Sequence, residues 1–313
     1  MKALAVVLEQ PQQLALSELA LSEPAADDVV VDIEWSGIST GTERLLWLGQ
    51  MPQFPGLGYP LVPGYESVGR IREAGAHSGH RVGERVFVPG ARCFGEVRGL
   101  FGGAASTLVV NGARVTPVAE QLGEHAVLLA LAATAQHALS AEGARAPELI
   151  IGHGVLGRLL ARITVAMGAA PPVVWETRAQ RASGARGYTV IDPQDDPRRD
   201  YRAIYDASGD ARLLDTLIGR LAPGGEIVLA GFYSAPLQFA FAPAFMREAR
   251  IRVAAEWKPR DLAAVNALID SGALALDQLI THREPAAHAE RAYRTAFGDA
   301  ACLKMILDWR KAA

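Results

Sequence analysis

The chain has very few cysteines. Only Cys93 and Cys302 occur among its 313 residues, and they lie far apart in the sequence. So small a number argues against a disulfide framework and predicts a protein of the reducing cytoplasm. An excess of positive charge is missing as well, because 31 Lys and Arg face 34 Asp and Glu and the formal net charge is −3. Nothing in this charge balance favours a nucleic acid as partner.

Long hydrophobic runs are also missing, although 50% of the residues are hydrophobic. The longest apolar run, Ala126 to Ala135, is too short to cross a bilayer. The apolar stretch Ala3 to Leu8 is too brief for the core of a signal peptide, so we expect it to form a first β-strand. These features predict a cytoplasmic globular protein without an integral membrane segment.

The pattern of residues along the sequence changes near residue 118. Before it, short alternating runs separated by Gly and Pro predict a β-rich region. After it, residues 121–142 have helical length, and strands alternating with helices follow. The strands that we expect in this second part are Leu149–Ile151, Val173–Trp175, Ala203–Asp206 and Glu226–Ala230.

This order predicts an α/β protein of two domains. Residues 118–256 are expected to form a Rossmann domain with a doubly wound parallel sheet. Residues 1–117 are expected to form a β-rich domain that residues 257–313 rejoin. Within that last segment we expect a helix from Arg260 to Ser271 and a predominantly helical C-terminus. The segment Leu221-Ala-Pro-Gly-Gly225 is expected to form a turn.

The most informative segment is Glu148-Leu-Ile-Ile-Gly-His-Gly-Val-Leu-Gly-Arg158. It reads as a buried strand, a Gly-x-Gly-x-x-Gly turn and the start of a helix. Glycines at these positions allow a tight turn and close approach of the backbone to a diphosphate, and the helix N-terminus favours negative charge. The residues predicted to contact the cofactor here are Gly152, Gly154, Val155, Leu156 and Gly157.

An acidic residue follows at the place where such folds bind the adenosine ribose. Glu176 ends the second strand of this region, about 20 residues after Gly157, and its carboxylate can accept hydrogen bonds from both ribose hydroxyls. Arg178 and Arg181 offer an alternative, because arginine after this strand can bind the 2′-phosphate of NADP. A carboxylate would repel that phosphate, so we expect NAD as the cofactor.

Several motifs resemble those of the medium-chain dehydrogenase/reductase family. Gly37-Ile-Ser-Thr-Gly-Thr-Glu43 is similar to the family's Gly-Ile-Cys-Gly-Thr-Asp, and Gly64-Tyr-Glu-Ser-Val-Gly69 to its Gly-His-Glu-x-x-Gly. Segments 206–209 and 224–231 resemble its later Rossmann strands. The resemblance covers nearly the whole chain and implies a GroES-like substrate domain beside the Rossmann domain. It also implies that Ala207, Ser208 and Gly231 line the nicotinamide, and that a homodimer is possible.

The chain departs from the family at its metal sites. Catalytic zinc in this family needs a thiolate, an imidazole and a third ligand. Thr40 stands at the expected Cys and Tyr65 at the expected His, and segment 128–134 contains no Cys. Cys93 stands alone where the structural zinc needs four cysteines. We therefore expect neither metal.

Within the family, the zinc-free layout is most similar to enzymes that oxidise the 3-(1-hydroxyethyl) group of a bacteriochlorophyllide to 3-acetyl. The resemblance therefore implies a tetrapyrrole substrate and NAD-dependent alcohol oxidation. Two alternatives stay open. One is an NADPH-dependent quinone or enone reductase, and the other is a nucleotide-binding scaffold without catalytic activity.

Alcohol oxidation without a metal still requires the hydroxyl proton to leave, and a positioned acid–base group typically contributes about 10²- to 10⁴-fold. The resemblance places Thr42 where relatives carry the hydroxyl that relays this proton. Tyr65 could form a hydrogen bond with the substrate oxygen. Glu66 could take part in the proton transfer or orient its neighbours. These three are the predicted catalytic residues; Glu43 and His137 are further candidates.

The stretch from Leu45 to Leu61 is unusually apolar and includes Trp47 and Phe54. One hypothesis is a wide apolar wall for a flat macrocycle, because ligand pockets are mostly apolar. The other is a loop that packs against its own domain or a dimer partner.

Overall fold

The computed structural model describes residues 1–53 and 55–310. Phe54, which we had considered as part of an apolar wall, therefore lies outside the described residues. The chain divides into two compact units, here called unit 1 (Met1–Ala130 with Leu279–Ala313) and unit 2 (Leu131–Gln278). No helix in the described part of the chain is both long and apolar enough to cross a membrane.

Unit 1 is built mainly from β-strands, because its sequence alternates short β-branched runs with Gly and Pro. Its strands are β1 (Lys2–Gln10), β2 (Gln13–Ala20), β3 (Asp28–Ile38), β4 (Leu61–Val62), β5 (Ser67–Ala74), β6 (Arg85–Val88), β7 (Arg98–Gly99), β8 (Thr107–Asn111), β9 (Thr116–Pro117), β16 (His282–Pro285) and β17 (Met305–Asp308). Its helices are α1 (Thr42–Leu48), η1 (Gly112–Arg114), η2 (Glu120–Leu128), η5 (Ala286–His288) and α8 (Ala289–Gly298).

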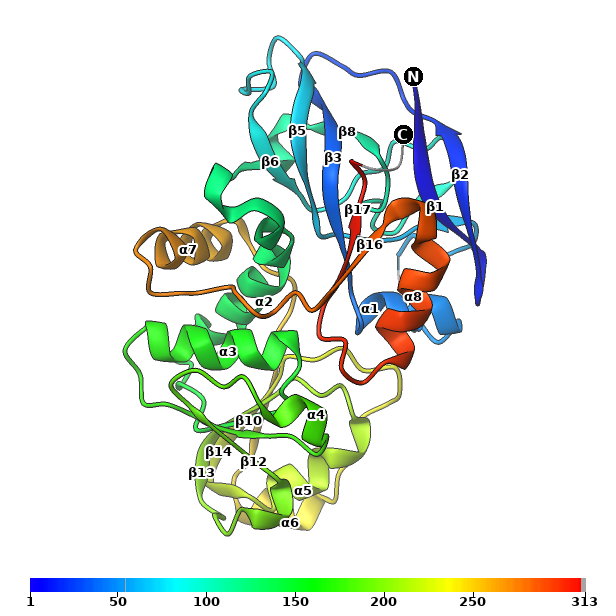
Figure 1. Ribbon diagram of the computed structural model, residues 1–313. Coiled ribbons are helices and arrows are strands. Elements are labelled where there is room, and N and C mark those ends of the chain that lie inside the picture. The colour runs from blue at the N-terminus through cyan, green and yellow to red at the C-terminus, as the bar shows by residue number, and fades with distance from the viewer. Residues whose placement is uncertain (54, 311–313) are drawn as a thin grey trace. The chain divides into compact units, whose positions relative to one another are not determined.

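Two sheets form in unit 1. One has the order β2-β1-β4-β7, and the other the order β16-β17-β3-β5-β6-β9 with β8 also paired to β3. The C-terminal segment enters the second sheet, where β17 runs antiparallel to β3 with Met305 opposite Ile38. Figure 1 shows this red strand beside the blue one. We had expected a predominantly helical C-terminus, and this was wrong for residues 282–285 and 305–308, because β17 pairs with β3, which lies far away in the sequence, and β16 pairs with β17.

Unit 2 is a parallel sheet with helical connections. Its strands are β10 (Leu149–Ile151), β11 (Val173–Trp175), β12 (Thr189–Ile191), β13 (Tyr201–Asp206), β14 (Leu221–Leu229) and β15 (Arg250–Val253). Its helical elements are α3 (Val155–Ala166), α4 (Ala179–Ala182), η3 (Pro193–Asp195), η4 (Ala211–Leu213), α5 (Leu214–Ile218), α6 (Phe241–Met246) and α7 (Pro259–Asp270), and α2 (Leu129–Leu139) leads into the unit.

The sheet order β12-β11-β10-β13-β14-β15 is the doubly wound order expected from the sequence. Every neighbouring pair is parallel. The order reverses at β10, so that the loops after β10 and β13 meet at one edge of the sheet. Ligands in folds of this kind bind at such a point. The core beneath it contains Leu149, Ile204, Leu217 and Ile227, which are fully buried.

Two local expectations need correction. Residues 221–225, expected as a turn, begin strand β14, whose register against β13 shifts between Tyr201 and Ala203. Gly224, at φ 68, accommodates the irregularity within the strand. Residues 121–142, expected as one helix, form η2, which is kinked at Gly123 by non-helical backbone angles, and then α2, which ends at Leu139.

The units divide after Ala130 and after Gln278, whereas the sequence placed the domain boundaries after residues 117 and 256. Polar contacts account for the second difference. The Asp261 carboxylate hydrogen-bonds to Nδ1 of His137 at 2.8 Å. Arg162 donates to the carbonyls of Ala275 at 2.8 Å and Asp277 at 3.0 Å. The segment around α7 is thereby attached to unit 2.

Candidate functional site

The glycine turn between β10 and α3 is tightly built. Gly152 has φ 91, a conformation that side chains rarely adopt. A Cβ added to Gly157 would lie 1.9 Å from the Gly152 carbonyl oxygen, so helix and strand approach closely only because this residue is glycine. No side chain caps α3 at Gly154. The first N–H groups of the helix therefore remain available to an anion, and the turn fits a diphosphate.

Glu176 is in direct contact with this turn. One carboxylate oxygen accepts a hydrogen bond from the His153 N–H at 3.1 Å, and the other accepts one from the Arg178 N–H at 2.8 Å. A carboxylate has about four acceptor positions, so capacity remains for the two hydroxyls of a ribose. The Arg178 side chain itself is exposed. The arrangement fits an unphosphorylated adenosine ribose.

The loop after β13 lies beside the glycine turn. A Cβ added to Gly152 would lie 3.5 Å from Cα of Ser208. The backbone N–H and hydroxyl of Ser208 both donate to the Asp206 carboxylate, at 2.8 and 2.6 Å, while burial raises the pKa of Asp206. The Gly231 N–H donates to the Asp206 carbonyl at 2.9 Å. The predicted residues Ala207, Ser208 and Gly231 thus lie at the same sheet edge as the turn.

Unit 1 brings together a group of hydroxyls. The Tyr65 hydroxyl lies 2.9 Å from Oγ of Ser39. Burial is the largest effect on Tyr65 and raises its pKa, while hydrogen bonds with Ser39 and Thr42 act in the opposite direction. A phenol whose pKa is raised stays protonated at neutral pH, so Tyr65 can donate a hydrogen bond but is a poor base. Thr42 and Tyr65, predicted together from the sequence, are therefore neighbours.

Glu66 has a different environment. Its side chain is 0% exposed, and both carboxylate oxygens accept hydrogen bonds from Nζ of Lys304, at 2.6 and 2.9 Å. Lys304 also donates to the Ile38 carbonyl at 3.2 Å. Burial raises the pKa of Glu66, and the Lys304 ammonium opposes that shift. Enclosed in this way, Glu66 can orient its neighbours without touching a substrate.

Glu43 is a second buried carboxylate, at 1% exposure. It accepts hydrogen bonds from the Ser39 N–H at 2.9 Å and from the Tyr293 hydroxyl at 2.6 Å. Burial raises the pKa of Glu43 to about 7, and the two hydrogen bonds oppose the shift. Glu43 therefore carries a proton over part of the neutral pH range.

The remaining candidates have structural surroundings. His137 is bonded to the Asp261 carboxylate. Leu46, Trp47 and Leu61 are buried in the hydrophobic core of unit 1, and Trp47 packs against Tyr293 with ring centroids 6.5 Å apart. For these residues the structure favours a segment packed on its own unit over an apolar substrate wall.

The side-chain oxygens around Tyr65 do not form a ligand set that fits a catalytic zinc. They are hydroxyls, and two nearby carboxylates are already engaged, Glu66 by Lys304 and Glu43 by Tyr293. Hydroxyls are not among the usual zinc ligands, which are thiolates, imidazoles and carboxylates. In residues 1–53 and 55–310, no three His, Cys, Asp or Glu side chains are grouped so that they could hold a metal ion.

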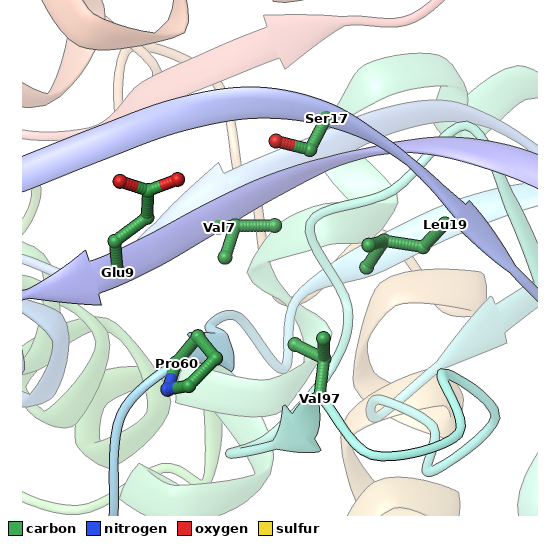
Figure 2. A pocket seen from close by; sticks show the side chains of 6 residues that line it. All are labelled: Val7, Glu9, Ser17, Leu19, Pro60 and Val97. Atoms are coloured by element: carbon green, nitrogen blue, oxygen red, sulfur yellow. The ribbon is translucent and has the colours of Figure 1, made fainter.

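Unit 1 also has a surface cavity of about 310 Å³ over the β1–β2 hairpin. Figure 2 shows its lining side chains, none of which is a predicted site residue: Val7, Glu9, Ser17, Leu19, Pro60 and Val97.

Sequence reasoning missed three residues of these networks. Lys304 carried a signal, because it is a single charge between Leu303 and Met305 in an otherwise apolar run. Tyr293 carried none, since it lies on a helix with no motif. His153 occupies a variable position of the glycine motif, which does not predict that its side chain is buried.

The comparisons with known proteins agree with this architecture. Residues 25–120 match the family model described as the alcohol dehydrogenase GroES-like domain. The chain is 58% identical over its full length to the 2-desacetyl-2-hydroxyethyl bacteriochlorophyllide A dehydrogenase of Rhodobacter capsulatus, which it covers completely. It is also 58% identical to the protein of the same name from Cereibacter sphaeroides, with 100% of both chains covered.

Solved structures show the same fold at lower identity. A 2R,3R-butanediol dehydrogenase from Bacillus subtilis aligns with a TM-score of 0.84 at 18% identity, covering 98% of this chain and 99% of that one. An alcohol dehydrogenase from Escherichia coli, complexed with NADH, aligns with a TM-score of 0.82 at 21% identity over 98% and 99% of the two chains. The likeness to these structures shows the fold, and together with the 58% identity to two dehydrogenases it implies a nicotinamide cofactor.

We expect Lys304→Met to lower the free energy of unfolding by about 3–5 kcal/mol, because Glu66 would be left buried without its counter-charge. The measurement is urea denaturation at neutral pH. Arg283→Met is the matched control, since Arg283 pairs with Glu124 near the surface and should lose at most about 1 kcal/mol. The double variant Glu66→Gln, Lys304→Met should recover part of the loss. Equal stability of the Lys304 and Arg283 variants would contradict a structural role for the buried pair.

Glu43 should give the stability a pH dependence. Its pKa is about 7 in the folded chain against 4.5 for the ordinary carboxyl, so the folded state binds the extra proton between these values. The contribution of Glu43 to stability is therefore present at low pH and is lost as pH rises through 7. Thermal unfolding of Glu43→Gln should lack this decline and exceed the wild type at pH 8. If the stabilities of the wild type and Glu43→Gln change with pH in parallel, this role of Glu43 is disproved. Glu290→Gln, at an exposed glutamate, is the control for removing one negative charge.

Proposed function

The chain belongs to the medium-chain dehydrogenase family, and on that premise we propose that it oxidises the hydroxyethyl group of a bacteriochlorophyllide to acetyl, with NAD and without zinc. The observation that carries the substrate is the full-length 58% identity to two dehydrogenases named for that compound. The alcohol carbon loses a hydride and the hydroxyl loses a proton, which yields a ketone, reduced cofactor and H⁺. A nicotinamide, when bound, accepts the hydride.

Unit 2 supplies the cofactor site in this proposal. The N–H groups of Val155, Leu156 and Gly157 at the start of α3 hold the diphosphate, and Gly152 and Gly154 let the backbone approach it. Glu176 accepts the ribose hydroxyls, which favours NAD over NADP because a 2′-phosphate would meet the carboxylate. The loops that contain Ala207, Ser208 and Gly231 flank the nicotinamide end.

Unit 1 supplies the groups that handle the hydroxyl proton. Thr42 accepts the proton of the substrate hydroxyl while it releases its own hydroxyl proton to solvent, and Tyr65 donates a hydrogen bond to the substrate oxygen. The raised pKa of Tyr65 supports a donor role. Glu66 is a positioning residue that acts through Lys304 and the Ile38 carbonyl. The hydroxyl donors around Tyr65 support a mechanism without a metal Lewis acid.

The test is to mix purified protein, NAD and 3-hydroxyethyl bacteriochlorophyllide and to follow the red-shifted absorption of the acetyl product. We expect Thr42→Val and Tyr65→Phe each to lower kcat by about 10²-fold or more, because each removes a group that handles the proton or the oxygen. Tyr59→Phe is the control, since its hydroxyl bonds to the Leu46 carbonyl within unit 1.

Turnover should survive treatment with a strong chelator. Wild-type rates in both the Thr42 and Tyr65 variants would remove these residues from the mechanism. Turnover of enones with NADPH, with none of the bacteriochlorophyllide, would instead indicate a reductase. Nucleotide binding without any turnover would indicate a scaffold.

We further propose that the protein forms a homodimer through the edge of the unit 2 sheet. β15 is the last strand of the sheet order, and Val253 on it is 73% exposed. Phe241, Phe245 and Met246 on the preceding helix α6 are exposed as well. An exposed apolar edge strand can pair with a second copy of itself.

Val253→Asp should therefore shift the molar mass in light scattering from a dimer to the 33.3 kDa of one chain. Val82→Asp, at a valine that is 68% exposed in unit 1, is the matched control and should remain dimeric. A wild type that is monomeric, or a Val253 variant that stays dimeric, would exclude this edge as the interface.

A further inference from the structure

The side chain of His153, inside the glycine turn, points into unit 2 and is 0% exposed. Its Nδ1 lies 2.6 Å from the Arg181 carbonyl oxygen, and its Nε2 lies 2.8 Å from the Tyr188 hydroxyl. The two rings meet edge to face with centroids 5.6 Å apart. His153 therefore connects the turn to the segment that follows Glu176 in the chain.

The partners of His153 determine its tautomer. A carbonyl oxygen only accepts hydrogen bonds, so Nδ1 carries the proton and Nε2 accepts from the Tyr188 hydroxyl. The neutral ring makes both bonds at once. Burial lowers the pKa of His153 to about 4, so that this form is the one present near neutral pH.

Arg158 strengthens the same connection from the first turn of α3. Its side chain is buried, and its Nε donates to the His153 carbonyl at 3.0 Å. Its Nη2 donates to the carbonyls of Arg181 at 3.0 Å and Ser183 at 2.7 Å. We call His153, Arg158 and Tyr188 the clamp. The bond between Arg158 and the His153 carbonyl lies within the glycine turn and α3, and the other bonds of the clamp join these two elements to residues 181–188.

The clamp bears directly on Glu176. The backbone N–H of His153 donates to one oxygen of that carboxylate, while the side chain of the same residue holds the Arg181 carbonyl. Glu176 therefore lies between two fixed points, the turn before it and the segment after it. The backbone N–H groups of His153 and Arg178 hold the two oxygens of the Glu176 carboxylate in this position.

We propose that the clamp determines cofactor specificity, by fixing the Glu176 carboxylate where it accepts an unphosphorylated ribose and repels a 2′-phosphate. This inference rests on the proposed function, because it assumes that a nicotinamide dinucleotide binds at the turn. Loosening the clamp frees Glu176 to move and allows Arg178 and Arg181 to approach a phosphate. Arg181 is already close, since its Nη1 lies 4.0 Å from where a Cβ of Gly154 would be.

Calorimetric binding of NADH and of NADPH tests the proposal without catalysis. Tyr188→Phe removes one hydrogen bond of the clamp, and we expect the ratio of the NADPH to the NADH dissociation constant to fall by about three- to tenfold. His153→Ala removes the side-chain bonds of His153, and the ratio should fall by more than about tenfold. Tyr205→Phe is the matched control, because the Tyr205 hydroxyl is buried in unit 2 and bonds to the Arg145 carbonyl at 2.9 Å.

The outcomes separate the inference from the proposed function. An unchanged ratio in both clamp variants, with thermal stability lowered as in Tyr205→Phe, would reduce the clamp to a structural feature. A wild type that binds both nucleotides equally would overturn the inference and leave the dehydrogenase intact. A wild type that binds neither nucleotide would overturn both. A ratio that falls only in the clamp variants supports the proposal.

Discussion

The buried ion pair between Glu66 and Lys304 is the constraint on which unit 1 depends. It joins a residue next to β5 to one next to β17, so that the two separate chain segments of the unit meet at a fully buried ion pair. A Cβ on Gly37 would lie 2.1 Å from the Glu66 carboxylate. Strand β3 can therefore lie beside the ion pair only because residue 37 is glycine. Lys304 also holds the Ile38 carbonyl, directly before the segment that carries Ser39 and Thr42. The pair thereby positions the hydroxyl group proposed to handle the substrate proton.

Each unit buries polar groups around its proposed site. Unit 1 encloses two carboxylates and leaves hydroxyls as the chemically useful groups. Unit 2 keeps the Glu176 carboxylate at the edge of the sheet and buries a histidine and an arginine beneath it. Buried polar groups are stabilising only when their hydrogen bonds are satisfied, and the bonds of His153 and Arg158 go to main-chain carbonyls and one tyrosine hydroxyl. Because these hydrogen bonds are made, we expect the cofactor turn to be rigid.

Local patterns predicted much of the fold. Strands β10 and β11 have the expected bounds, because each is a short apolar run between turn residues. The glycine turn was recognisable since only glycine permits its angles and close contacts. Residues 221–225 were misinterpreted because Pro and Gly usually end a strand, whereas here the strand absorbs them with a register shift. The strands of the C-terminal segment were missed because β17 pairs with β3, a partner that local periodicity cannot reveal.

The sequence by itself determined the class of fold, the nucleotide turn, the acidic residue after β11 and the absence of the usual zinc ligands at the expected positions. These depend on residue type and short spacing, which a linear pattern contains. Tertiary structure alone decided that Glu66 faces Lys304, that Tyr293 meets Glu43 and that His153 turns inward to Tyr188. Each of these contacts joins residues 35 to 250 positions apart. Burial and hydrogen bonding at such separations arise only when the chain is folded, and they set the protonation state and orientation of each side chain.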